Sequence, residues 1–167
     1  MRLFVALLLS EEIKNSITAK LHELKKNNVR GNYPPVQNLH VTIAFLGDVK
    51  DDSAVKEALQ NIKFKPFRLS LADMEISGDT LCVGIKGNQG LNGLAKDVRA
   101  ALDSAGIECD KKKFTPHITM IRKMTGNWKT CKAPKGEMMV KRLSLMKSEM
   151  KDGKRSYTEI FSVQSGV

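Results

Sequence analysis

The stretch NLHVTIAFLG, at residues 38–47, places a histidine, His40, at the mouth of an apolar strand, with a threonine two residues later. The same pattern returns as TPHITMIRK at residues 115–123, where His117 stands 77 positions after His40. Because side chains alternate faces along a strand, each histidine shares a face with its threonine. The chain has three histidines in all, and two of them occupy this repeated pattern.

Each motif ends a unit of strand, helix and strand. In the first unit, residues 2–9 (RLFVALLL) lack alternation, which predicts a strand buried on both faces. Ser10 is suited to cap a following helix, whose apolar residues recur at helical spacing: Ile13, Ile17, Leu21 and Leu24. In the second unit, a helix over 91–105, stopped by Gly106, precedes the second motif.

The other segments follow from turn residues and periodicity. Residues 29–38 (VRGNYPPVQN) predict a loop, because one glycine and two prolines interrupt any regular element. Asp51 or Asp52 caps a helix that carries Val55, Leu59 and Ile62 on one face. Residues 67–77 and 80–87 predict an antiparallel pair, and the last segment, from residue 138 to 163, predicts a hairpin over an Asp-Gly turn.

The length of 167 residues suits one compact domain. Since no linker separates the two related units, we expect a single bilobal domain over residues 1–167, with approximate lobes 1–76 and 77–167 around a cleft.

Composition limits the class of partner and the compartment. The net charge of +10 favours polyanions such as nucleic acid, although a solvated lysine-rich surface is the alternative. No apolar run is long enough to span a bilayer. Three scattered cysteines, without a CxxC pair, predict reduced thiols, so we expect a cytoplasmic protein that does not bind membranes.

Two histidines that face each other across a cleft suit in-line displacement at phosphorus. One imidazole removes a proton from the attacking oxygen and the other protonates the departing one, since an ordinary pKa of ~6.5 allows both states near neutrality. The hydroxyls of Thr42 and Thr119 can donate to phosphate oxygens. Two histidines without a third ligand make a poor metal site, so we expect neither metal nor cofactor. His22, on the first helix, is interpreted as a surface residue.

The stretches RLFVAL, LHVTIAFLGDV, FTPHITMIRK and LSLMKSEMKDGKRSY together resemble the RNA 2′,3′-cyclic phosphodiesterases, first named 2′-5′ RNA ligases, of the two-histidine phosphoesterase superfamily. The resemblance covers the whole chain. It implies an α+β fold with two pseudo-symmetric lobes of mainly antiparallel sheet, outer helices and a central cleft.

The same resemblance implies the roles of individual residues. His40 is the proton donor and His117 the proton acceptor, while Thr42, Thr119 and Arg122 bind phosphate. Strict alternation places Arg122 on the face opposite His117, so it needs a strand end or a bulge to reach the cleft. Phe4 matches an aromatic residue near the nucleoside, and a core aromatic is the alternative.

The expected function is metal-independent opening of 2′,3′-cyclic phosphates to 2′-phosphates, by a monomer, on RNA ends or cyclic-phosphate nucleotides. Reversal would give 2′-5′ ligation. One alternative keeps the site but changes the substrate to small nucleotides such as ADP-ribose 1″,2″-cyclic phosphate. Another is a non-catalytic RNA-binding protein, which would have no need of an acid–base pair.

Overall fold

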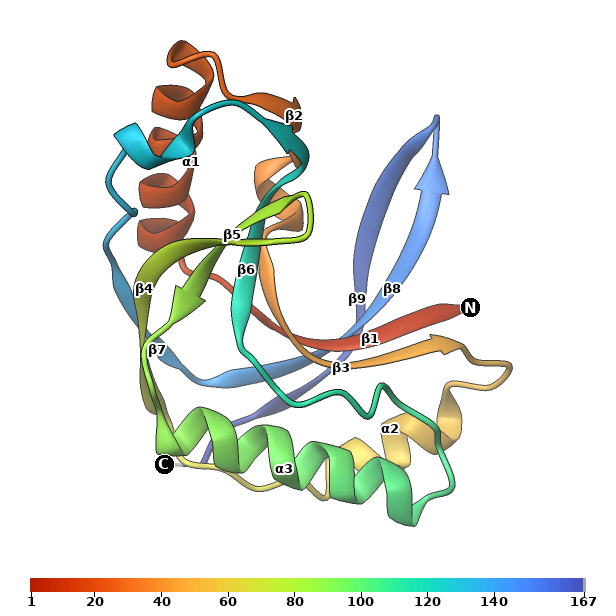
Figure 1. Cartoon of the computed structure of the whole chain (residues 1–167). Coiled ribbons are helices and arrows are strands. Elements are labelled where there is room, and N and C mark those ends of the chain that lie inside the picture. Colours follow the sequence, from red (N-terminus) through yellow and green to blue (C-terminus); the bar gives the residue numbers. More distant parts are fainter. Residues whose placement is uncertain (167) are drawn as a thin grey trace.

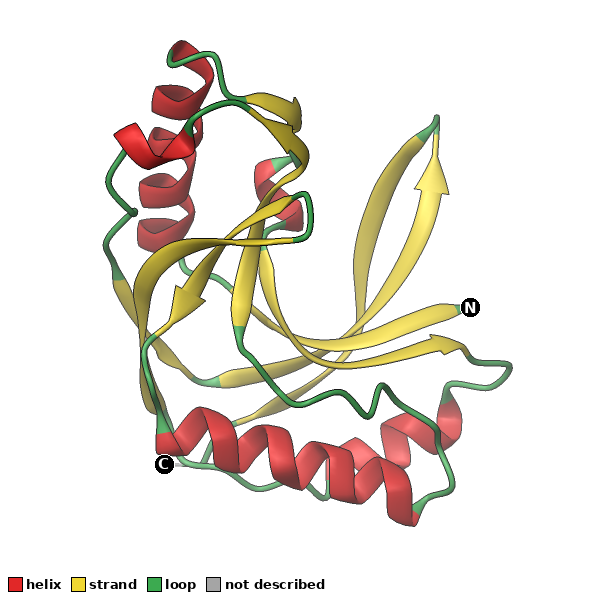
Figure 2. Ribbon diagram, viewed as in Figure 1, coloured by secondary structure: helices red, strands yellow, loops and turns green. Residues whose placement is uncertain are grey.

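The computed structural model describes residues 1–166. Within them, three α-helices lie outside one strongly curved sheet of nine strands (Figures 1 and 2). The helices are α1 (Glu11–Lys26), α2 (Ser53–Gln60) and α3 (Gln89–Ser104). The strands are β1 (Arg2–Leu8), β2 (Arg30–Asn32), β3 (His40–Asp48), β4 (Phe67–Ser77), β5 (Thr80–Ile85), β6 (His117–Thr125), β7 (Glu137–Val140), β8 (Arg142–Lys151) and β9 (Lys154–Gln164). The predicted α+β class is confirmed.

The order of strands in the sheet places the two motif strands side by side. The order is β7-β4-β5-β6-β3-β1-β8-β9, with antiparallel neighbours, and β2 pairs with β6 off this path. The central pair, β6 and β3, meets at Val41 and Ile118. Each is flanked by the strand that precedes its own helix, β5 or β1. Each half of the sheet therefore repeats the predicted unit of strand, helix and motif strand.

The two halves of the sheet do not correspond to the N-terminal and C-terminal halves of the chain. The predicted lobe boundary, between residues 76 and 77, falls at the end of β4, which pairs with β5. The C-terminal strands β8 and β9 lie beside β1. Each half of the sheet therefore contains strands from both predicted lobes.

The core lies between the helices and the convex side of the sheet. Residues 3–7 of β1 are all buried, as their unbroken apolar run predicted. The Ser10 side chain accepts a hydrogen bond from the Ile13 amide and starts α1, whose four predicted apolar residues are buried. Gly106, with φ of +73°, follows the end of α3 in the left-handed conformation that glycine adopts without strain.

Ile62, predicted on the second helix, lies beyond the end of α2 at Gln60. Two further predicted segments differ from the structure. The predicted loop at 29–38 contains strand β2 and a 3₁₀ turn, η1 (Val36–Asn38), because its first residues pair with β6. The predicted C-terminal hairpin forms between β8 and β9, but its first residues form a separate strand, β7. Strand β7 pairs with β4, at the far edge of the sheet.

Candidate functional site

Both motif strands carry one extra residue directly after the motif threonine. On β6, Cys82 of β5 pairs with Thr119 and the adjacent Leu81 pairs with Ile121, so Met120 is an insertion. The register between β1 and β3 shifts in the same way at Ile43. A bulge reverses the alternation beyond it. Arg122 therefore returns to the face of Thr119, and both residues line one cavity. The bulge that the predicted role of Arg122 requires is present.

The two motif histidines are held alike at the starts of their strands. Nδ1 of His40 lies 2.6 Å from the carbonyl oxygen of Asn38, and Nδ1 of His117 lies 2.9 Å from that of Thr115. Since a carbonyl only accepts, Nδ1 carries the proton in both neutral rings. Nε2 is then the nitrogen of each neutral ring that can accept a proton. In His40 it lies 3.0 Å from the hydroxyl oxygen of Thr42.

His40 is largely shielded from water, and its neighbours are aromatic. The rings of Phe4 and Tyr157 lie with centroids 4.9 and 5.4 Å from that of His40. Burial lowers the pKa of His40 below its usual value, and the positive charges of Arg122 and His117 act in the same direction. The carbonyl of Asn38 opposes this shift by accepting from the ring.

Phe4 lies beneath His40 and does not line the cavity. Its side chain is 4% exposed and packs with Ala6 and Met146. A ring this buried offers little surface on which a base could stack. Contact of Phe4 with a nucleoside stays a prediction. The structure favours the core alternative, in which Phe4 supports the imidazole.

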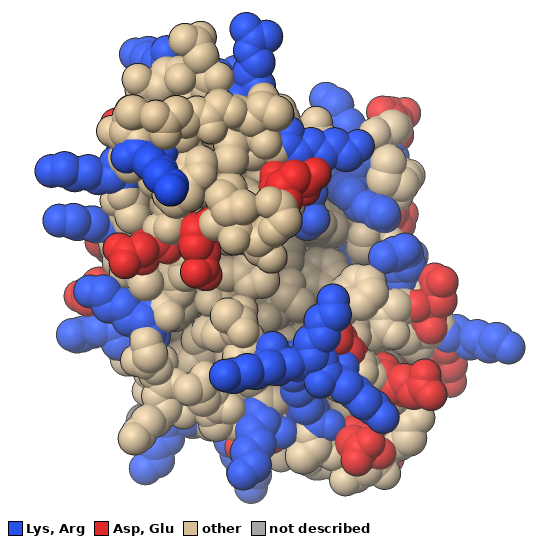
Figure 3. All heavy atoms as spheres, in the orientation of Figure 1, with Lys and Arg blue, Asp and Glu red and all other residues tan. Residues whose placement is uncertain are grey.

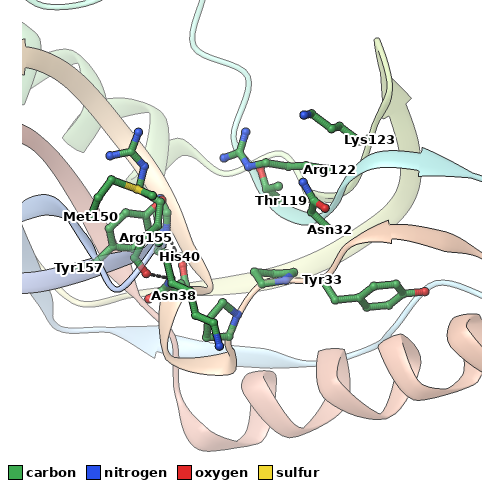
Figure 4. A pocket seen from close by; sticks show the side chains of 14 residues that line it. Asn32, Tyr33, Asn38, His40, Thr119, Arg122, Lys123, Met150, Arg155 and Tyr157 are labelled. Atoms are coloured by element: carbon green, nitrogen blue, oxygen red, sulfur yellow. Dashed lines mark hydrogen bonds between the residues drawn. The ribbon is translucent and has the colours of Figure 1, made fainter.

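A cavity of about 810 Å³ opens beside His40. Figure 4 shows Arg122 and Lys123 on one side and Met150, Arg155 and Tyr157 on the other. Thr119 also lines it, whereas Thr42 and His117 do not. His117 is exposed at the start of β6. The full lining is Asn32, Tyr33, Pro34, Pro35, Asn38, His40, Thr119, Arg122, Lys123, Met150, Gly153, Lys154, Arg155 and Tyr157.

Several of these lining residues were missed from the sequence. Tyr157 and Arg155 come from β9, which joins β1 only through β8, and no local pattern marks that register. Asn38 acts on His40 through a backbone carbonyl, which every residue has. The basic stretch KDGKR at 151–155 was the one available signal, because lysine and arginine at a hairpin turn suit an anion.

Within residues 1–166, no three His, Cys, Asp or Glu side chains gather in a way that could hold a metal ion. His22 lies exposed on α1, as predicted. No helix among the described residues has the length and apolar character needed to cross a bilayer.

Comparison with known proteins gives consistent matches. The sequence profile of the 2′-5′ RNA ligase superfamily matches residues 11–152. The RNA 2′,3′-cyclic phosphodiesterase of Geobacillus stearothermophilus is 32% identical over 132 residues, 74% of this chain and 42% of the relative. The Aquifex aeolicus protein of the same name is 30% identical over 132 residues, 72% of this chain and 70% of the relative.

The fold of the chain is also similar to that of a solved structure. The apo crystal structure of E. coli LigT superimposes with a TM-score of 0.86 at 26% identity, covering 98% of this chain and 96% of LigT. LigT has also been crystallised with 3′-AMP, and that structure matches with a TM-score of 0.83 at 27% identity, over 96% of this chain and 95% of LigT.

Proposed function

The chain belongs to the 2′-5′ RNA ligase superfamily, and from this premise we propose that it hydrolyses the 2′,3′-cyclic phosphate ends of RNA to 2′-phosphates. The observation that carries the proposal is the matched pair of imidazoles on adjacent strands. Each has Nδ1 tied to a carbonyl, which leaves Nε2 for proton transfer, and in His40 this atom also contacts the hydroxyl of Thr42. The names of the Geobacillus and Aquifex relatives support the same reaction.

The reaction needs one base and one acid. Nε2 of His117 removes a proton from water as the water oxygen attacks phosphorus. The bond from phosphorus to the ribose 3′-oxygen breaks, and Nε2 of His40 gives that oxygen its proton. The product carries a 2′-phosphate and a 3′-hydroxyl. After the product leaves, His40 regains a proton from solvent and His117 releases one.

Negative charge grows on the non-bridging phosphate oxygens during the attack. Arg122 and the hydroxyl of Thr119 line the cavity beside His40, and the hydroxyl of Thr42 touches the ring of His40. These groups are suited to donate to the oxygens where charge develops. No step requires a metal ion or a cofactor.

The lowered pKa of His40 bears on its role as the acid. In the free protein, burial and two neighbouring positive charges favour the neutral ring. A phosphate anion seated beside the ring opposes those charges and favours the protonated form. Binding of substrate therefore prepares the acid at the moment when it is needed.

The same residues can run the reaction in reverse. A 5′-hydroxyl in place of water would give a 2′-5′ linkage, with the two histidines exchanging roles by microscopic reversibility. We further propose that residues 1–167 act as one bilobal domain, as a monomer in the cytoplasm. Three cysteines without disulfides support that compartment.

The test is turnover of a short RNA that ends in a 2′,3′-cyclic phosphate, in excess EDTA, with phosphorus NMR of the product. The expected product is a 2′-phosphomonoester, formed at the same rate with and without EDTA. Binding without turnover would favour the non-catalytic RNA-binding alternative. Loss of activity on chelation, restored by one metal ion, would refute the mechanism.

A further inference from the structure

The cavity holds more positive charge than one cyclic phosphate needs. Four cations line it, and none of its lining residues is acidic: Arg122, Lys123, Lys154 and Arg155. None of the four forms a salt bridge with another described residue. Like charges gathered around one cavity repel unless an anion lies between them. A cyclic phosphate carries a single negative charge, which leaves most of this positive charge without a partner.

The backbone of β6 turns two consecutive cations into the same cavity. Neighbouring residues of a regular strand point to opposite faces, yet Arg122 and Lys123 both line the cavity. Lys123 has φ of +51°, a left-handed conformation that is unfavourable for a residue other than glycine. Such local strain is concentrated at binding sites. In Figure 4 both side chains extend from β6 over the cavity.

The other two cations come from the β8–β9 hairpin, on the opposite wall. Lys154 and Arg155 follow an Asp-Gly turn in which Asp152 and Gly153 both have positive φ. One guanidinium nitrogen of Arg155 donates to the hydroxyl of Ser148 at 3.3 Å. A guanidinium has five N–H donors, so others are available for a ligand. Figure 3 shows Lys and Arg side chains on both sides of the hollow on this face.

The hairpin is tied to the catalytic histidine through Asn38. The side-chain amide of Asn38 donates to the backbone carbonyl oxygen of Arg155 at 3.1 Å. The backbone carbonyl oxygen of Asn38 accepts from Nδ1 of His40. The hairpin, close to its turn, and the imidazole are therefore both contacted by Asn38. A ligand bound by the hairpin is thereby held in a fixed position relative to His40 and the phosphate that reacts there.

The volume of the cavity agrees with a ligand larger than one nucleotide. At about 810 Å³ it lies in the upper part of the range for small-molecule sites. Apolar surfaces from Tyr33, Pro34, Pro35 and Met150 line it between the charges. Such a lining suits bases and riboses between two anionic groups.

We propose that Lys123, Lys154 and Arg155 form a second phosphate subsite, which binds the internucleotide phosphate on the 5′ side of the cyclic end. This inference rests on the proposed function and narrows it, since the preferred substrate is then an RNA chain and not a cyclic mononucleotide. Arg122 and the two histidines serve the reacting phosphate.

The test compares kcat/KM for three substrates: a nucleoside 2′,3′-cyclic phosphate, a dinucleotide with the same cyclic end, and that dinucleotide with a neutral methylphosphonate linkage. The wild type is expected to prefer the charged dinucleotide by about tenfold or more, as for loss of one charge-assisted hydrogen bond. The double variant Lys154→Ala, Arg155→Ala is expected to lower this preference toward one. The control variant Lys147→Ala, Lys151→Ala removes the same amount of charge from β8 outside the cavity. This variant should keep the preference for the charged dinucleotide.

Equal rates on the mononucleotide and the dinucleotide would overturn the subsite, as would an equal preference for the neutral linkage. A preference for ADP-ribose 1″,2″-cyclic phosphate over the dinucleotide would overturn the assignment to RNA. If no cyclic phosphate is turned over, the proposed function fails and the subsite is still tested by binding. The dinucleotide 2′-phosphate should then bind more tightly than the mononucleotide 2′-phosphate, and Lys154→Ala with Arg155→Ala should remove the difference.

Discussion

His40 and His117 differ in their surroundings although they are held by the same backbone contact. His117 is exposed, whereas His40 lies against Phe4 and Tyr157. The same motif therefore gives two imidazoles with different access to water. This difference could not be predicted from the sequence, because the aromatic ring of Tyr157 comes from a strand far along the chain.

The burial of His40 predicts a pH effect of changing Tyr157. Tyr157→Ala admits water to the ring, which raises the pKa of His40 toward its usual value. In the proposed mechanism His40 acts protonated, so kcat/KM falls as pH rises through that pKa, and the falling limb should move to higher pH. Tyr157→Phe keeps the ring and should leave the limb in place.

The measurement is a pH profile of kcat/KM together with an NMR titration of the ring nitrogens of His40. The titration is needed because the kinetic limbs report the coupled pair and not one residue. A limb that stays in place in Tyr157→Ala, or moves equally in Tyr157→Phe, would show that the ring of Tyr157 does not control this pKa.

Among the secondary-structure elements, local patterns were reliable and distant pairings were not. The caps and apolar spacing of α1 and α3 predicted both helices within two residues of their ends, because a helix depends on its own hydrogen bonds. Strand β7 pairs with β4 about seventy residues earlier, a contact that only the folded sheet determines. The bulge at Met120 has no marker in the sequence, although it decides where Arg122 points.

Strand β2 pairs with β6 just beyond this bulge, at Arg122 and Thr125, and one glycine makes the close contact possible. Gly31 has φ of +150°, and a Cβ there would lie 2.7 Å from the carbonyl oxygen of Arg122 and 3.0 Å from that of Lys123. Gly31→Ala is therefore expected to push β2 away from β6 and to displace both cations from the cavity. Both the temperature of thermal unfolding and kcat/KM should fall.

Gly93→Ala is the control for this substitution. Gly93 lies within α3 with no atom near the added methyl group, so the change should raise stability by about 0.5–1 kcal/mol relative to glycine and leave turnover alone. If Gly31→Ala melts at the wild-type temperature with wild-type activity, β2 does not hold the bulge in place.

At the scale of the whole molecule, the net charge of +10 is spread over the surface, and four of the 28 basic side chains line the cavity. If all four lining cations contact phosphates of a single-stranded RNA, the logarithm of the binding constant should fall with the logarithm of salt concentration with a slope of roughly −3. Titration of a labelled oligonucleotide at several salt concentrations measures this slope. A flat response would mean that the charge is not used to bind RNA.

The pseudo-symmetric sheet places the two motif strands side by side. The central claim of the proposed mechanism is that their histidines, one from each half, act on the same phosphate. Acid and base that act in one step lose their effect together, so the losses are not independent. His40→Ala and His117→Ala should each lower kcat at least ~10²–10⁴-fold, as is typical of general acid–base catalysis. The exposed His22 supplies a matched control, and His22→Ala should be nearly silent.

The most direct measurement is kcat on an RNA with a 2′,3′-cyclic phosphate end, for the two single variants and the double variant, with folding verified by circular dichroism. The predicted result is that the double variant is little slower than either single variant. A folded His40→Ala or His117→Ala protein with wild-type turnover would contradict the assignment, and so would a double variant whose loss equals the product of the single losses.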